Sequence, residues 1–500
     1  MLLAGDDLRE VRLPGPVQLV NPPPPLEPLP DFPAAVTAAL DMPLGLPPLE
    51  RLAGRGARVT VAFDDPCLPL PPPLVDPRQV VLRAVVARLT AAGVRREDIA
   101  LVCANGLHRR WTARELRPIV GATLARRFGD RVECYDAEDP GANVSLGRTE
   151  SGLVVEVSRR VTDADLVVYV GVPWTEMNGG HKSLACGLAT YRCVAQHHRA
   201  GVQAASPLME PESSHMHRCL GEIGRYIGSR VPVFQVETVV NNRLWAGPWR
   251  LLDVHRPRVP LLLRPAQRLP GGVRGRLRGA LRGFYQPAGV WAGAVEPVHA
   301  AVRERLRGAR GRAEAAADIL VLGLPNLSPY AVHSRMNPLL VANLGLGYAF
   351  QFGRGRPLVR PGGYLVLANP CSPGFHREHH AAYARFWDEV LPETRDPSRM
   401  ETEFEPRFAA DPALVGAYRF GYAYHPAHPF FAWYWMARAR AHVGGVVVAG
   451  AEDVRVVERL GFQAAAGVEE AVTRARAVLG ADAVVAVQTI PPVFTVDVAG

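Results

Sequence analysis

The chain has 500 residues, 48% of them hydrophobic, and a formal net charge of +9. This length and composition predict two large domains with sizeable cores. There is no run of eighteen apolar residues and no basic-then-apolar leader, so we expect a cytoplasmic protein without membrane spans. The seven cysteines are scattered and show no C-x-x-C spacing, which indicates reduced thiols rather than a disulfide framework or a structural zinc site.

The charge excess comes from arginine and is densest at Arg274–Arg282. A basic stretch can follow phosphates, but this one lacks interleaved stacking aromatics and matches no nucleic-acid module. We therefore expect a solvated basic face and no nucleic-acid partner.

Residues 1–55 are rich in proline, with four in a row at Pro22–Pro25. Such a segment favours an extended arm, which we expect to pack on the first domain.

Residues 56–260 alternate between strand and helix patterns, which predicts an N-terminal α/β domain. Asp76-Pro77 begins a helix that runs to about Ala92, and Thr112-x-x-Glu115 is a capping box that begins another. The expected strands are 58–63, 98–103, 131–135, 164–170 and 232–240.

Residues 261–289 are rich in proline, glycine and arginine and resemble an interdomain connection. Residues 290–500 then repeat the alternation, with strands expected at 318–324, 363–368, 446–449 and 483–487, and helices at 336–350, 452–460 and 468–479. The predicted fold class is α/β, with two parallel-sheet domains that enclose an interdomain cleft.

Polar loops follow three of the expected strands in the first half. They are Asp64-Asp65, Asn105-Gly106-Leu107-His108-Arg109 and Gly179-Gly180-His181-Lys182. Parallel strands place their carboxyl ends at one edge of a sheet, so the three loops are expected to line one crevice.

Lys182 is the only lysine of the chain. An amine can lose its proton and form a covalent bond, whereas a guanidinium stays protonated, so a chemical role is favoured over chance survival in an arginine-biased sequence. The two preceding glycines would let backbone approach a ligand closely.

Histidines supply the other candidate groups. His108 follows a strand and could be a general base or a surface histidine bonded to backbone. In one straight helix His198 would lie ~24 Å from Lys182, so the chain must fold back near Gly187 or a bound group must bridge them. Because adjacent side chains point apart, only one of His197 and His198 could bind a metal ion.

The remaining histidines are weaker candidates. His376, His379 and His380 could bind zinc, but a solvated helix start is the favoured interpretation. His425 and His428 flank prolines beside the aromatic run Phe430–Trp435, which we interpret mainly as packing. No dinucleotide-binding G-x-G-x-x-G and no P-loop are present.

Taken together, the three loops, with Pro69 after the first and His198 sixteen residues after Lys182, resemble the nickel-pincer lactate racemase family. The resemblance covers most of the chain and is best over residues 55–245.

The resemblance implies two α/β domains around the nickel complex of a pyridinium dithio mononucleotide, supplied by cofactor-synthesis enzymes. Lys182 would be the covalent anchor, His198 the nickel ligand and His108 the base for the substrate hydroxyl. Hydride would pass from substrate to cofactor and back, inverting a 2-hydroxy acid. Further residues implied to position cofactor or substrate are Asp64, Asp65, Arg109, Gly179 and Gly180.

Several positions depart from the family pattern. Leu68 stands where the family has an arginine. Val172 stands where the family has its second catalytic histidine, so Glu176 or His181 is expected to act as the replacement base. The family's substrate-binding Gln/Lys pair is replaced by Ser334, Arg335 and Asn337. A guanidinium there could hold a carboxylate bidentately, which suggests a 2-hydroxy acid larger than lactate.

Two other functions stay open at this point. Lys182 could form a Schiff base in a lyase, or the protein could be a non-catalytic relative that binds the cofactor.

Overall fold

The computed structural model describes residues 1–499 apart from 68–70, 246–257, 260 and 262–263. Leu68 and Pro69 of the first polar loop lie outside the described residues, as does part of the expected connection after residue 260.

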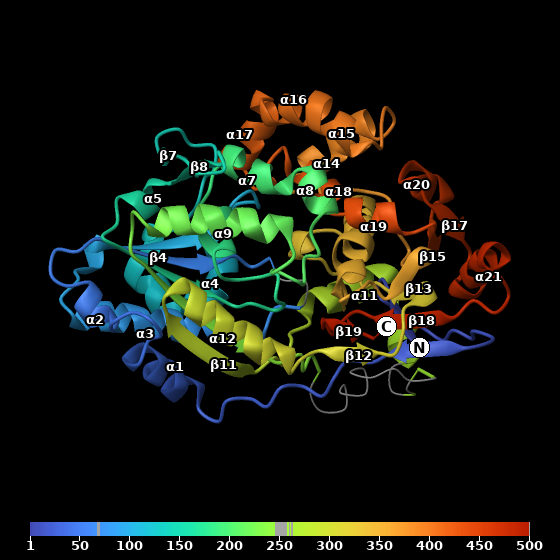
Figure 1. The fold of residues 1–500 in the computed structure, drawn as a ribbon, viewed down its shortest axis with the longest axis horizontal. Helices are drawn as coiled ribbons and strands as arrows, with labels where there is room; N and C mark the ends of the chain where they lie inside the picture. The colour runs from blue at the N-terminus through green and yellow to red at the C-terminus, as the bar shows by residue number, and fades with distance from the viewer. Residues whose placement is uncertain (68–70, 246–257, 260, 262–263, 500) are drawn as a thin grey trace.

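The first sheet has six strands in the order β11-β10-β9-β4-β5-β6 (Figure 1). All neighbours pair in parallel except β11, which is antiparallel to β10. The five predicted strands are confirmed and β11 is an addition. The bounds are β4 Val59–Asp64, β5 Ile99–Ala104, β6 Val132–Cys134, β9 Leu166–Gly171, β10 Val233–Val240 and β11 Pro287–Gly293.

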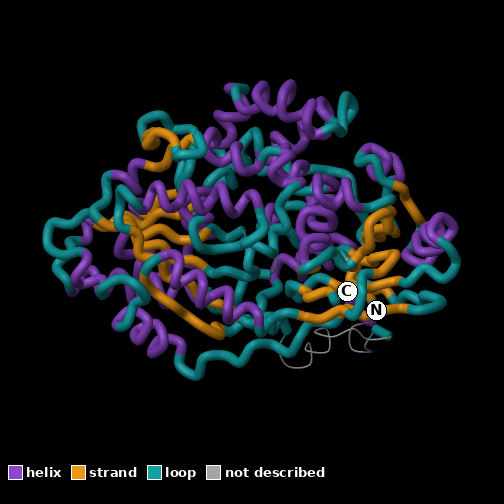
Figure 2. Tube along the Cα trace, in the orientation of Figure 1, coloured by secondary structure: helices purple, strands orange, loops and turns teal. Residues whose placement is uncertain are grey.

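Helices cover both faces of this sheet (Figure 2). Side chains alternate along β4, so that Val61 and Phe63 pack with α1, α3 and α4 while Ala62 packs with α9. The predicted helix starts are confirmed, because Asp76 accepts a hydrogen bond from the Arg78 amide and Thr112 forms the capping box with Glu115. The bounds are α1 Phe32–Asp41, α3 Pro77–Ala91, α4 Ala113–Phe128 and α9 His215–Gly228.

The second sheet is wholly parallel, in the order β17-β16-β15-β13-β18-β3. The four predicted strands of this half are confirmed, as are helices α20 Val454–Arg459 and α21 Val468–Leu479. The predicted two-domain α/β class is therefore correct. The strands are β3 Val17–Val20, β13 Ala317–Gly323, β15 Val359–Ala368, β16 Gly445–Ala449, β17 Gln463–Ala465 and β18 Val485–Thr489.

A helical insertion between β15 and β16 lies against the first domain. Tyr418 donates a hydrogen bond to the Gly106 carbonyl (2.8 Å), and the His425 amide donates to the Leu107 carbonyl (3.1 Å). One hydrophobic cluster runs through both halves, so the insertion covers the polar loop after β5. Its main helices are α14 Ala381–Arg385, α17 Pro412–Phe420, α18 His428–Tyr434 and α19 Ala437–His442.

Most of the remaining elements are short. They are the hairpins β1 Leu2–Ala4 with β2 Asp7–Arg9 and β7 Asn143–Arg148 with β8 Val154–Ser158, a small sheet of β12 Gly311–Ala313, β19 Val496–Val498 and β14 Gly353–Arg354, and helices α2 Leu49–Leu52, α5 Arg159–Thr162, α8 Ala200–Ala204, α10 Arg264–Gln267, α11 Gly271–Ala280, α12 Val295–Arg307, α13 Pro338–Ala342, α15 Pro397–Arg399 and α16 Glu405–Ala409.

Two expected boundaries need correction. The 1–55 arm is not confined to the first domain, because β3 joins the second sheet while α1 packs on the first. The boundary at residue 290 falls inside β11, and both β11 and the following α12 pack on β10. The first domain therefore continues to about Arg307. The end of the Gly/Pro-rich segment forms an edge strand of the first sheet, which the composition of the segment did not indicate.

The basic segment is partly neutralised. Arg278 pairs with Asp6 (2.5 Å) and Arg274 pairs with Asp7, so α11 is tied to the N-terminal hairpin.

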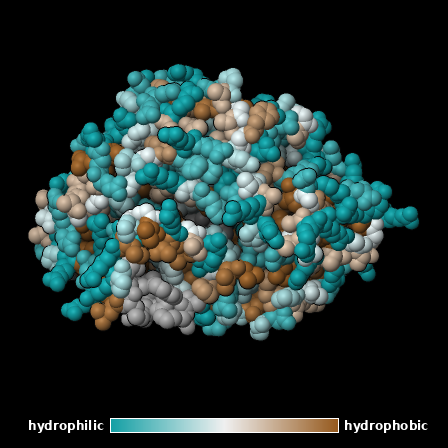
Figure 3. All heavy atoms as spheres, turned by 180° about the vertical axis from the view of Figure 1, so that it is seen from behind, coloured by the Kyte–Doolittle hydropathy of each residue, from teal (hydrophilic) through white to brown (hydrophobic). Residues whose placement is uncertain are grey.

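The surface in Figure 3 is mostly hydrophilic, with a band of hydrophobic residues across its lower half. In the part of the chain that the structure describes, no helix combines the length and apolar character needed to cross a bilayer.

Gly106 offers a test of how closely the loop after β5 packs. Its φ is +51°, and a Cβ there would lie 2.4 Å from the Cys186 carbonyl oxygen. Gly152, at φ +87° with nothing within 4 Å, is the matched control. Both alanine variants should lose about 1–3 kcal/mol through backbone strain, and Gly106→Ala about 2 kcal/mol more through overlap. Urea unfolding measures the difference, and equal losses would contradict the packing described.

Candidate functional site

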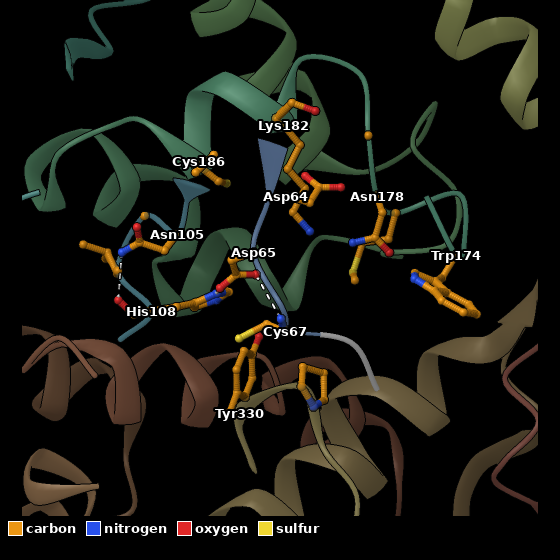
Figure 4. Close-up of a pocket in the computed structure, with 18 of the residues that line it drawn as sticks. Asp64, Asp65, Cys67, Asn105, His108, Trp174, Asn178, Lys182, Cys186 and Tyr330 are labelled. Carbon is orange, nitrogen blue, oxygen red and sulfur yellow. Dashed lines mark hydrogen bonds and ion pairs between the residues drawn. The ribbon is translucent and has the colours of Figure 1, made fainter. Parts of the chain in front are cut away.

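A cavity of about 190 Å³ lies at the carboxyl ends of the first-sheet strands (Figure 4). The three polar loops expected to meet do so here, and the second half closes the opposite side. The lining includes Asp64, Asp65, Asn105, Gly106, His108, Val172, Gly179, Lys182 and His198 from the first half, and Tyr330, Tyr348, His428, Phe431 and Trp435 from the second.

Arg78, which sequence reasoning missed, fixes the loop after β4. Its buried guanidinium pairs with Asp76 (2.6 Å) and donates to the carbonyls of Asp64 (2.6 Å) and Asp65 (2.8 Å). Asp64 accepts from the Tyr169 hydroxyl (2.8 Å), and burial raises the pKa of this carboxyl despite the nearby Arg78. The two aspartates thus have different partners.

Asp65 orients His108. The Nδ1 of His108 lies 2.9 Å from Asp65 Oδ2, and Trp111 Nε1 donates to the same oxygen (3.2 Å). Burial alone would raise the pKa of Asp65, but His108 and the Cys67 amide lower it. A carboxylate only accepts, so Nδ1 carries the proton and Nε2 is left for a ligand.

The glycines before Lys182 approach a buried carboxylate, which sequence reasoning did not foresee. The Gly180 amide donates to Glu237 Oε1 (2.6 Å), and a Cβ on Gly179 would lie 2.4 Å from that oxygen. Glu237 also accepts from His299 Nδ1 (3.1 Å). A glutamate inside the apolar strand β10 was the available signal. Only Gly179 of the two glycines lines the cavity.

Lys182 begins helix α6 Lys182–Gly187 and is partly buried. Among the described residues, no hydrogen-bond or ion-pair partner of its Nζ is found, and the Trp435 ring centroid lies 5.6 Å away. Burial lowers the pKa of the amine, against the opposing effects of Cys186 and Asp64. A larger fraction of it is therefore neutral and nucleophilic than in an ordinary lysine.

The expected fold-back near Gly187 is confirmed. Helix α6 ends there, and α7 Tyr191–His198 begins after the N-cap Thr190. His198 therefore reaches the cavity that Lys182 lines. Its Nδ1 donates to the Val194 carbonyl (3.1 Å), and burial lowers its pKa to about 3. Its Nε2 thus keeps a free lone pair, the form of imidazole that binds metals.

The aromatic run does more than pack. His428, Phe431 and Trp435 line the cavity, and the last two stack on the His198 ring at centroid distances of 4.9 and 5.9 Å. His428 Nδ1 lies 2.6 Å from the Tyr383 hydroxyl, which fixes the ring. These residues reach the first domain only through the tertiary structure. The sequence pattern alone could therefore not distinguish them from residues of the hydrophobic core.

Three other candidates lie outside the cavity lining. Arg109 is buried against Trp111 and pairs with Glu115 (2.6 Å). Glu176 is buried and pairs with Arg310 (2.8 Å). His181 pairs with Glu296 (2.7 Å). Each therefore has a structural partner instead of facing the cavity.

The expected substrate-binding trio is also elsewhere. Asn337 is buried and caps α13 by accepting from the Leu340 amide (3.0 Å). Arg335 is exposed, and neither it nor Ser334 lines the cavity. The same loop instead delivers Pro329 and Tyr330 to the cavity.

The interpretation of His376, His379 and His380 as a solvated helix start was wrong for two of the three. His379 and His380 are buried. His380 lies 2.9 Å from the Tyr330 carbonyl and 3.2 Å from Asn337 Nδ2, so it supports the loop that carries Tyr330.

These features define a two-domain α/β protein with a lysine, three histidines and two aspartates at one interdomain cavity. Residues 6–208 match the family model described as the lactate racemase N-terminal domain. This match agrees with the resemblance drawn from the loops of the chain.

Two solved structures are similar in fold. The lactate racemase apoprotein from Thermoanaerobacterium thermosaccharolyticum is 17% identical with a TM-score of 0.63, and the match covers 100% of this chain and 99% of that one. A Thermotoga maritima protein from a structural genomics consortium is 12% identical with a TM-score of 0.55, covering 93% and 97%. No curated protein matched the chain.

The ion pair of Arg109 predicts a pH-dependent stability. Burial alone would raise the pKa of Glu115, but Arg109 and hydrogen bonds from Thr112 lower it to about 2. The pair therefore stabilises the fold above the ordinary glutamate pKa of about 4.3, and this is lost as pH falls through 2.

Glu115→Gln keeps the capping geometry and removes the charge. It should cost about 1–3 kcal/mol at pH 7, and its difference from wild type should vanish toward pH 2. Urea unfolding at several pH values measures this. Glu133→Gln, which breaks the exposed pair with Arg160, is the control and should cost under about 1 kcal/mol. If Glu115→Gln and Glu133→Gln lost the same free energy of unfolding at every pH, the buried pair of Arg109 with Glu115 would not be the source of a pH-dependent stability.

Proposed function

We propose that the protein is an isomerase that racemises or epimerises a 2-hydroxy acid with a nickel-pincer nucleotide. The observation that carries this proposal is that one cavity holds His108, the free Nε2 of His198 and a Lys182 amine with no hydrogen-bond or ion-pair partner among the described residues. The lactate racemase N-terminal domain match supports the same reaction class.

The side chains that line the cavity suit a nickel-pincer nucleotide. Lys182 offers a partly neutral amine for attachment, and His198 offers a neutral imidazole for nickel. The cavity volume of about 190 Å³ is below the roughly 300–1,000 Å³ of sites that enclose drug-sized ligands. Loading of a mononucleotide therefore requires the two halves to move apart.

When bound, the nickel-pincer nucleotide would supply a reversible hydride acceptor. The chain supplies proton transfer and orientation. His108 Nε2 takes the proton of the substrate hydroxyl, and Asp65 stabilises the imidazolium that forms. Phe431 and Trp435 exclude water from the reacting atoms.

The second proton transfer falls to His428 in this proposal. Val172 occupies the place of the family's second histidine, while Glu176 and His181 are engaged in ion pairs. His428 lines the cavity with its ring centroid 5.3 Å from that of His108. It thus replaces the base lost from the first domain.

The proposed partners are a small 2-hydroxy acid and the cofactor-synthesis enzymes, in the cytoplasm. A Schiff-base lyase is a second candidate, because burial lowers the pKa of Lys182. The histidine beside it favours the nickel chemistry, since a Schiff-base lyase has no need of a metal-ready imidazole.

Lys182→Arg tests the attachment. The variant keeps the positive charge, but a guanidinium is a poor nucleophile, so protein made with the cofactor-synthesis enzymes should lose any covalent adduct. Intact-mass spectrometry and nickel content measure this, with circular dichroism to check folding. Wild type with neither an adduct nor equimolar nickel would contradict the proposal.

His108→Asn tests the proton transfer. With a panel of acids deuterated at C2, wild type should give inverted product that retains its deuterium, because hydride leaves and returns without passing through water. The variant should be slower by about 10²–10⁴-fold, the usual contribution of a general base. His376→Asn, outside the cavity lining, is the control and should keep wild-type activity. Deuterium lost to solvent would indicate proton abstraction at carbon instead.

A further inference from the structure

Three different metal-ligating side chains meet on one wall of the cavity. Asp65, Cys67 and His108 each offer a ligand atom, and these atoms all lie within 4.8 Å of one another. All three residues line the cavity. Figure 4 shows His108 and Cys67 beside Asp65, across the cavity from Lys182. The cluster is separate from the Lys182 and His198 pair that would hold a nickel cofactor.

We propose that Asp65, Cys67 and His108 form a protein-only site for a divalent transition metal of the zinc type. A carboxylate, a thiolate and an imidazole are the ligands that zinc and cobalt accept, whereas magnesium and calcium require oxygen ligands. Three protein ligands leave the fourth position open toward the cavity, which is the pattern of catalytic rather than structural zinc sites.

The surroundings hold the ligands in place. Trp111 Nε1 donates to Asp65 Oδ2 (3.2 Å), and the Cys67 amide donates to Asp65 Oδ1 (3.1 Å). The Tyr424 hydroxyl lies 3.6 Å from Cys67 Sγ. Arg78 fixes the backbone carbonyl of Asp65. Outer hydrogen bonds of this kind orient metal ligands and strengthen binding.

The arrangement already brings two ligands close together. His108 Nδ1 and Asp65 Oδ2 are 2.9 Å apart across a hydrogen bond. A metal ion there takes the place of that proton, which moves to Nε2 as the imidazole changes tautomer, and the Cys67 thiol releases its proton to solvent to become the third ligand. The metal would then occupy His108 and prevent it from acting as a base, so metal binding and the proposed racemisation exclude each other.

The probe is Zn²⁺ or Co²⁺ added to the full-length protein made without cofactor-synthesis enzymes and stripped with a chelator. Wild type should bind one equivalent, and the cobalt form should show a sulfur-to-metal charge-transfer band. Cys67→Ser should abolish the band and weaken zinc binding by at least about tenfold. Cys186→Ser removes the other cavity thiol and should leave both unchanged.

His108→Asn provides a second variant on a partly exposed side chain, should Cys67→Ser fail to fold, and it should also weaken zinc binding at least tenfold. Lys182→Arg should bind zinc like wild type, so this result stands whether or not a nickel cofactor is used. No metal bound by wild type, or equal affinity in wild type and the folded ligand variant, would overturn the site.

Discussion

The site depends on the primary amine of Lys182, which lies between the two domains. This amine has no hydrogen-bond or ion-pair partner among the described residues. Taking an ammonium out of water costs free energy unless it is paired or loses its proton. Lys182 lies near the Trp435 ring of the second half, and the nearby groups that favour its charged form do not offset burial. Such a group is destabilising on its own and is best explained by what it binds.

Groups from both halves of the protein keep the lysine in position. Glu237 and His299 anchor the glycine turn in the first domain, where any side chain would collide. The insertion between β15 and β16 then places Phe431 and Trp435 over the cavity and ties itself to the loop carrying His108. Neither domain encloses the cavity alone, because both halves supply lining residues.

Much of the fold follows from local patterns. Strands such as β4 and β9 are apolar on both faces, and caps such as Asp76 and Thr112 mark helix starts, so the parallel sheets could be predicted. The edge strands β3 and β11 could not, because β3 is short and partly exposed and β11 contains proline and glycine.

The residues of the site also differ in whether the sequence could predict them. Residues next to strand ends, such as Asp65, His108 and Lys182, could be grouped because sheet geometry brings these ends together. Arg109, Glu176 and Asn337 carry equally polar side chains, but their ion pairs and caps form only in three dimensions. His428 comes from an insertion whose docking no local pattern encodes.

Because Lys182 is the only lysine, its amine can be followed alone. Competitive labelling at a series of pH values, read by mass spectrometry with the Met1 amine resolved as a separate peptide, gives the pKa of Lys182 directly. The structure predicts a pKa lowered from the ordinary 10.5 by burial in the cavity. A side chain that titrates at the ordinary value and reacts as fast as a solvent-exposed amine would contradict the buried, unpaired lysine on which the account rests.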